Sequence, residues 1–174
     1  MKKSLSLYAA SVLLAFTMVN ASNSQHLHSA AAGDYIAGIT EFTDSSSLIR
    51  ANEVNTRVVR DFTRRYEGIS DAKWFKLKEG FVVYFTQNET RMRVVYDKRG
   101  TPLWTIRSYF EDKLPLEIRH IIRSTYYDFS IYHIDEITMN EKTVYLVKME
   151  DKTSWLTIRV TDGEMEVAEI YKKG

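Results

Sequence analysis

Apolar residues recur every fourth position in one segment of the N-terminal half. The spacing covers Val54, Val58, Phe62 and Tyr66. Side chains at this interval lie on one face of a helix. The pattern predicts a helix over 48–66, with Ser46 or Ser47 as its N-cap.

Alternation of apolar and polar residues then predicts four strands separated by short turns. We expect them at 72–78, 81–86, 90–96 and 101–109. Because gaps this short join only antiparallel neighbours, the strands form a meander. The third turn ends at Gly100, where glycine can adopt positive φ without a steric penalty.

The same order of patterns returns after residue 110. A second helical stripe consists of Leu114, Ile118, Ile121, Ile122 and Tyr126. Strand-like segments follow at 131–138, 143–149, 154–160 and 165–171. The sequence therefore predicts an α+β fold, in which two repeats (48–110 and 111–174) each contain a helix and a four-stranded antiparallel meander. In this α-β4-α-β4 arrangement both helices pack on one face of an antiparallel sheet.

The N-terminus has the pattern of a cleavable signal peptide. Lys2 and Lys3 precede an apolar segment, 5–19, that carries no charge. Val19 and Ala21 supply the small side chains that signal peptidase requires before a cut after Ala21. The apolar segment is shorter than the ~20 residues that span a bilayer. We therefore expect a periplasmic or secreted protein with no stable membrane insertion after cleavage.

Composition narrows the chemistry available to this protein. We expect a signal peptide at residues 1–21 and a folded domain at 48–174. Between them, residues 22–47 are mostly small and polar, which predicts a flexible leader. The chain has 24 basic and 23 acidic side chains, which argues against nucleic acid as its main partner. It has no cysteine, which excludes disulfides, thiol nucleophiles and cysteine-ligated metals.

Short motifs in both halves resemble a known family. In the first half they are Phe62-x-x-x-Tyr66, Ala72-Lys73-Trp74, the hairpin with Phe81 to Phe85, and Val95-Tyr96-Asp97-x-x-Gly100. In the second half they are Leu114-Pro115, the helix to Tyr126, the hairpin with Tyr145 and Val147, and Asp162-Gly163. The chain resembles the PepSY-like, or β-lactamase-inhibitor-protein-like (BLIP-like), proteins exported by Bacteroidetes. The resemblance implies the tandem fold and a sheet face able to bind protein. It does not imply a known activity, since most members of the family have none assigned.

Few residues suggest catalysis or metal binding. His26 and His28 lie in the expected leader, which offers no rigid ligand set. His133 and Asp135 share one face of an expected strand, and a hydrolase using this pair is an alternative function. The sequence has no nucleophile elbow, zinc-protease motif or phosphate-binding glycine loop. We expect no cofactor, no metal site and no catalytic residue.

The remaining candidate is the face of the sheet away from the helices. Alternation assigns Phe75, Leu77 and Phe81 to the core under the first helix. The opposite face is then expected to contain Trp74, Lys76, Tyr84, Arg91, Arg93, Trp155 and Arg159. Aromatic and arginine side chains are enriched at protein-binding hot spots. The sequence therefore predicts a non-catalytic module that binds a protein or peptide of the cell envelope, with inhibition of that partner as one role. A small-molecule or lipid carrier is a further alternative.

Overall fold

The structure is a computed structural model, and it describes residues 47–174. The expected signal peptide and most of the expected leader lie outside the described residues. So do Ala21, His26, His28 and Ser46.

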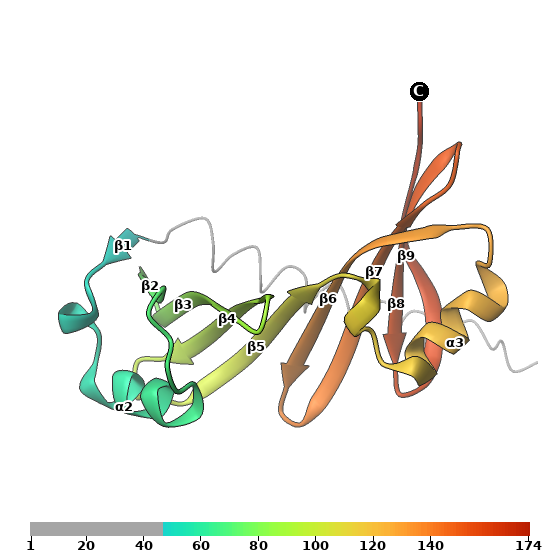
Figure 1. Cartoon of the computed structure of the whole chain (residues 1–174). Coiled ribbons are helices and arrows are strands. Elements are labelled where there is room, and N and C mark those ends of the chain that lie inside the picture. Colours follow the sequence, from blue (N-terminus) through green and yellow to red (C-terminus); the bar gives the residue numbers. More distant parts are fainter. Residues whose placement is uncertain (1–46) are drawn as a thin grey trace, which may run out of the picture. The chain divides into compact units, whose positions relative to one another are not determined.

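A single antiparallel sheet of nine strands organises the described residues (Figure 1). Each strand pairs with the next one along the chain, so the order in space is the order in sequence. The strands are β1 (Ser47–Ile49), β2 (Lys73–Leu77), β3 (Gly80–Gln87), β4 (Thr90–Asp97), β5 (Pro102–Tyr109), β6 (Ser130–Met139), β7 (Lys142–Glu150), β8 (Ser154–Thr161) and β9 (Glu164–Lys172). The expected α+β class is confirmed, and all eight expected strands are present.

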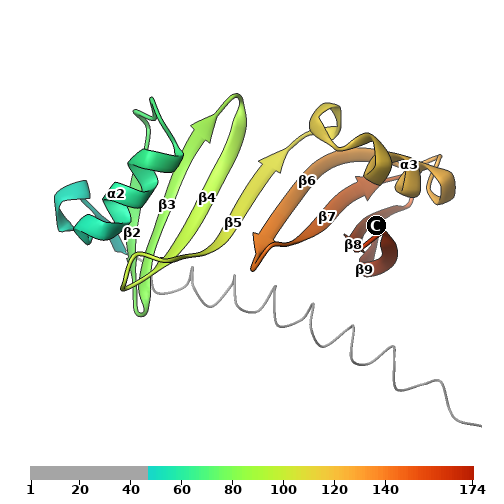
Figure 2. The ribbon, with the colours of Figure 1, turned by 90° about the horizontal axis from the view of Figure 1, so that it is seen from below.

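Two α-helices and two 3-10 turns complete the described fold. They are η1 (Ala51–Glu53), α2 (Thr56–Arg65), η2 (Glu111–Lys113) and α3 (Leu116–Thr125). Figure 2 shows α2 near the β2 end of the sheet and α3 near the β6–β9 end.

The first helix begins later than the pattern predicts. The Asn55 side chain accepts a hydrogen bond from the backbone N–H of Arg57 at 2.9 Å, so Asn55 is the N-cap of α2. Leu48 instead lies in β1, opposite Phe75 of β2. The predicted start at residue 48 and the predicted cap by Ser47 are therefore wrong, because Ser47–Ile49 form an added strand and Ala51–Glu53 form a 3-10 turn before the helix.

Both helices cover the same face of the sheet. The core under α2 contains Val54, Val58, Phe62, Trp74, Val83, Phe85, Met92, Val94 and Tyr96. The core under α3 contains Tyr109, Leu114, Ile118, Ile122, Ile131, Ile134, Val147, Met149, Leu156, Ile158 and Val160. Directly opposed residues on paired strands point to the same side of the sheet. The strand register therefore places both cores on one side. We call this side the helix face and the other side the helix-free face.

A polar strip lies between the two cores on the helix face. Thr105 of β5 faces Thr138 of β6, which faces Thr143 of β7. Beside them, the Arg107 guanidinium donates to Glu136 at 2.9 Å and the Tyr109 hydroxyl donates to the other Glu136 oxygen at 2.6 Å. Burial and this carboxylate raise the pKa of Tyr109. The strip separates the two hydrophobic cores of one continuous sheet.

The turn between β4 and β5 packs against the start of α2. Gly100 has φ of +94°, and a Cβ there would lie 2.9 Å from the Cβ of Arg57. The Asn55 amide donates to the carbonyl of Lys98 at 2.9 Å. The expectation of positive φ at Gly100 is confirmed, and the close approach to α2 gives a second reason for glycine.

Candidate binding face of the sheet

Strand register places five of the seven expected binding residues on the helix-free face. Arg91 faces Ser108, which in turn faces Asp135 across β5 and β6. This row of side chains continues through Leu146 to Arg159. The residues of the expected set on this face are Tyr84, Arg91, Arg93, Trp155 and Arg159.

Trp74 and Lys76 lie on the helix face, so their expected placement is wrong. Trp74 faces Val83 of the α2 core and is only 4% exposed. Its ring contacts Phe62 edge-on, with 5.1 Å between ring centroids. Phe75 and Leu77, expected in that core, point to the helix-free face instead. Both faces of β2 carry large apolar side chains, so alternation alone could not choose between them.

At the first-half end of the helix-free face, aromatic and cationic side chains stack on an apolar floor. Phe75 meets Tyr84 edge-on at 5.3 Å between centroids. The Arg93 guanidinium lies 4.9 Å from the centre of the Tyr84 ring, within the range of a cation–π interaction. Leu77, Val82 and Val95 are buried beside them. This stack gives a rigid, partly exposed surface.

Asp135 is the centre of a polar cluster in the middle of the helix-free face. Its carboxylate accepts hydrogen bonds from Ser108 at 2.6 Å and from Lys148 at 3.1 Å. His133 Nε2 lies 3.0 Å from the same carboxylate. Burial acts to raise the pKa of Asp135, but the Ser108 hydrogen bond and the Lys148 charge outweigh it, so the pKa lies below its ordinary value. Asp135 is therefore ionised at neutral pH.

The shared strand face expected for His133 and Asp135 is confirmed, but their contacts differ from those of a Ser-His-Asp triad. In a Ser-His-Asp triad the serine donates to the histidine, which accepts its proton. Here Ser108 donates to Asp135, and the carboxylate lies between the hydroxyl and the imidazole. The Asp135 carboxylate accepts a hydrogen bond from the Ser108 hydroxyl, and its lowered pKa makes it a weak base toward that hydroxyl.

Charged side chains at the second-half end of the helix-free face pair with one another. Arg159 forms an ion pair with Glu166 of β9, and burial lowers the pKa of Arg159. The Trp155 indole donates to Glu150 at 3.1 Å. Lys173 bonds the same carboxylate at 2.6 Å and lies 5.1 Å from the centre of the Trp155 ring. Trp155 is 42% exposed, so it remains available for contact.

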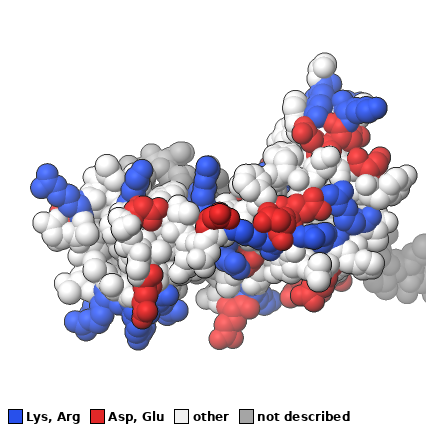
Figure 3. All heavy atoms as spheres, in the orientation of Figure 1, with Lys and Arg blue, Asp and Glu red and all other residues white. Residues whose placement is uncertain are grey.

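Charge pairing extends to the helix side of the second half. Two nitrogens of Arg123 hold the carboxylate of Glu111, with Nη2 at 2.8 Å from both oxygens. Arg119 donates to the backbone carbonyl of Glu111. In Figure 3, acidic and basic side chains alternate over η2 and α3. These contacts connect α3 to the segment that precedes it.

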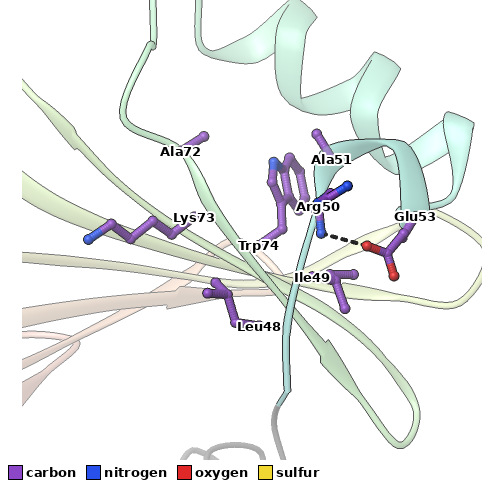
Figure 4. Close-up of a pocket in the computed structure, with 8 residues that line it drawn as sticks. All are labelled: Leu48, Ile49, Arg50, Ala51, Glu53, Ala72, Lys73 and Trp74. Carbon is purple, nitrogen blue, oxygen red and sulfur yellow. Dashed lines mark hydrogen bonds between the residues drawn. The ribbon is translucent and has the colours of Figure 1, made fainter.

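A shallow pocket of about 530 Å³ lies where β1 meets β2. Its lining residues are Leu48, Ile49, Arg50, Ala51, Glu53, Ala72, Lys73 and Trp74. In Figure 4, Trp74 points toward the helix and Leu48 points to the opposite side of the strands. The Glu53 carboxylate accepts from the backbone N–H of Arg50 at 3.0 Å. Five of the eight lining residues are apolar, and the other three, Arg50, Glu53 and Lys73, are charged.

Two further features of residues 47–174 bear on function. No three His, Asp or Glu side chains in this part of the chain are grouped so that they could hold a metal ion. No helix there has the length and hydrophobicity needed to cross a bilayer.

Sequence reasoning missed several members of this face. Phe75 was assigned to the core, and neither Ser108 nor Lys148 was considered. Ser108 and Lys148 become neighbours of Asp135 only through strand register, which fixes which residues of β5, β6 and β7 are opposite one another. A correct register for the predicted hairpins would have placed Lys148 near Asp135.

Comparison with known proteins identifies the fold. No family model matches the chain, and no curated protein matches it. Among solved structures, a DUF2874 family protein from Bacteroides uniformis ATCC 8492 is similar at 12% identity, with a TM-score of 0.56 over 68% of this chain and 89% of that one. A BLIP-like protein from Bacteroides fragilis NCTC 9343 is similar at 12% identity, with a TM-score of 0.55 over 68% and 86%.

A third similar structure comes from Bacteroides eggerthii DSM 20697, and its name assigns it provisionally to the periplasm. Its identity is 14% and its TM-score 0.55, over 68% of this chain and 88% of that one. At this level of identity the similarity shows a shared fold. The BLIP-like part of the predicted resemblance is supported at the level of fold, and the PepSY-like part stays a prediction.

Proposed function

We propose that this protein is an exported, non-catalytic binding module that holds a protein or peptide partner on the helix-free face of its sheet. It works in the periplasm or outside the cell, and inhibition of the partner is one role that such binding could have. The observation that carries the proposal is the placement of Tyr84, Arg91, Arg93, Trp155 and Arg159 together on the face that carries no described helix. Trp74 and Lys76 are not part of this proposed surface.

The composition and extent of the face support this proposal. Tyrosine, tryptophan and arginine supply most of the binding energy at typical protein interfaces. Nine strands spaced by 4.7–4.9 Å give a width of roughly 38 Å along the sheet. A surface of this width can bury the ~800 Å² per partner of a standard interface.

Localisation and architecture form part of the same proposal. The basic start, apolar segment and Ala21 cleavage pattern support export. The periplasmic assignment of one similar structure agrees with it. We also propose that the α2 half and the α3 half are tandem repeats, which is supported by their equal order of one helix followed by four strands.

Partner capture by matched variants tests the proposal. The tagged protein is used to capture proteins from the envelope fraction of its host, beside a Tyr84→Ala/Trp155→Ala double variant. A Tyr127→Ala variant is the control, because this tyrosine is 80% exposed and lies in the turn after α3. We expect a protein that the control retains and the double variant loses. Equal capture by all three proteins would contradict binding through this face.

A further inference from the structure

The four arginines within the strands divide into two pairs. Arg107 bonds Glu136 and Arg159 bonds Glu166, so these guanidinium groups are neutralised within the fold. Arg91 and Arg93 of β4 form no ion pair with any residue in the described part of the chain. Both unpaired arginines lie on the helix-free face, at the first-half end of the sheet.

Neighbouring side chains offer these two arginines no carboxylate. Arg91 faces Thr86 on β3 and Ser108 on β5. Arg93 faces Tyr84 and Ile106. Ser108 is committed to Asp135 by its own hydrogen bond. The unbalanced positive charge is therefore a property of the local strand sequence and register.

Arg93 is held in place while one of its donors is unused. Its guanidinium stacks on Tyr84, whose ring is in turn fixed by Phe75. Its Nε–H is buried and has no hydrogen-bond acceptor. The buried Nε–H is closed to a ligand, so a ligand would bond the terminal guanidinium nitrogens of a side chain that is already ordered.

We propose that this surface, formed by Phe75, Tyr84, Arg91 and Arg93, recognises an acidic side chain in the partner, with apolar residues beside that glutamate or aspartate. We call it the arginine surface. The inference rests on the proposed function and specifies the chemistry of the partner. A carboxylate matches the planar fork of arginine and accepts two parallel hydrogen bonds from it. The rings of Phe75 and Tyr84 provide apolar area for the flanking residues.

The spacing of the two arginines suits an extended acidic segment. Residues two apart on one face of a strand are separated by about 7 Å. Lys73, opposite Tyr84, extends the positive charge across β2. Charge of one sign at one end of the binding face would also fix the orientation of the partner.

Nitrogen-15 NMR of the arginine side chains in the full protein tests this inference. The probes are acetyl-Gly-Phe-Glu-Phe-Gly-amide and the matched peptide with glutamine in place of glutamate, each at millimolar concentration. We expect the Glu peptide to shift the Nε–H signals of Arg91 and Arg93 and to bind at least about tenfold more tightly than the Gln peptide. An Arg91→Gln/Arg93→Gln variant should lose this preference, and Arg60→Gln, on α2, should keep it.

Three results would overturn the inference. They are equal binding of the two peptides, no shift at Arg91 and Arg93 with either peptide, and equal shifts with inorganic phosphate. Partner capture separates this inference from the proposed function. A partner lost by Tyr84→Ala/Trp155→Ala but retained by Arg91→Gln/Arg93→Gln would mean that the face binds a partner without carboxylate recognition.

Discussion

The two halves of the sheet hold their helices with different side chains. The core under α2 is aromatic: Phe62 contacts Trp74 and Phe85 edge-on, each at 5.1 Å between centroids. The core under α3 is built largely from aliphatic residues such as Ile122 and Ile158. Each arrangement buries one stripe of a ten-residue helix. A similar order of elements is therefore compatible with quite different packing.

The helix-free face differs between the halves in a second way. In the second half, Asp135, Glu150 and Glu166 are each paired with a basic side chain. In the first half, Arg91 and Arg93 have no acidic partner in the described fold. Paired charges stabilise the fold or cost it little, whereas unpaired cations are available to a ligand. The comparison separates a region whose charges are balanced within the fold from one whose cations are available to a partner.

Replacing each tryptophan separately by alanine should give the largest difference in unfolding free energy between the halves. Trp74→Ala removes a ring that is 4% exposed and should lower the free energy of unfolding by about 3–5 kcal/mol. Trp155→Ala removes a ring that is 42% exposed and should cost less than about 1 kcal/mol. Urea unfolding followed by circular dichroism measures both values. Similar losses would mean that the face assignment of one tryptophan is wrong.

The polar strip between the cores should show the next largest effect. Glu136→Gln disturbs the acceptor shared by Arg107 and the buried Tyr109 hydroxyl, and should cost about 1–3 kcal/mol of unfolding free energy. Glu79→Gln is the control, since its ion pair with Lys98 is exposed on both sides and should contribute little. Thermal unfolding of the two variants compares them. An unchanged melting temperature for Glu136→Gln would contradict a structural role for the strip.

Asp135 should make stability depend on pH at the acid end. Its pKa in the folded protein is below the ordinary value of 3.8, so the ionised carboxylate stabilises the fold above that value. The contribution is lost as pH falls through the folded pKa. Asp135→Asn should therefore be less stable than the natural protein at pH 7, with a smaller loss than Glu136→Gln. The difference in unfolding free energy between Asp135→Asn and the natural protein should narrow below pH 3.8. A gap independent of pH would contradict the assigned contacts.

The smallest effect on stability is expected at the arginine surface. Arg91→Gln/Arg93→Gln should lower the unfolding free energy by less than about 1 kcal/mol, since it removes the contact of Arg93 with the Tyr84 ring but no ion pair of the described fold. Arg159→Gln removes a buried guanidinium from Glu166 and should cost about 1–3 kcal/mol. Chemical unfolding at two salt concentrations gives both numbers. A large loss in the double variant would show that these arginines serve the fold rather than a ligand.

The sequence was sufficient to predict the strands and the approximate positions of the helices. Turn residues and alternation located eight strands, since each local signal agrees with the final sheet. The added strand β1 was missed because its three residues are too few to show an alternation of apolar and polar side chains. A 3-10 turn at Ala51–Glu53 and the cap at Asn55 separate β1 from α2, and a single asparagine is a weak signal for the start of a helix.

The binding face was harder to predict than the fold. Arg91 and Arg93 were placed correctly because β4 alternates clearly between arginine and apolar residues. In β2, Trp74 and Phe75 are adjacent and both large, so a choice of face required the register with β3. Asp135 was placed on a face by alternation, but its contacts with Ser108 and Lys148 depend on three strands at once. Local pattern therefore predicts which residues share a strand face better than it predicts which ones meet.

Radical footprinting in the host envelope extract tests the central claim most directly. Hydroxyl radicals modify exposed aromatic rings, and mass spectrometry measures the extent at Tyr84, Trp155 and Tyr127. The account predicts that the extract protects Tyr84 and Trp155, relative to buffer, while Tyr127 stays equally reactive. Protection of Tyr127 alone, or unchanged reactivity of Tyr84 and Trp155, would contradict a partner bound to the helix-free face.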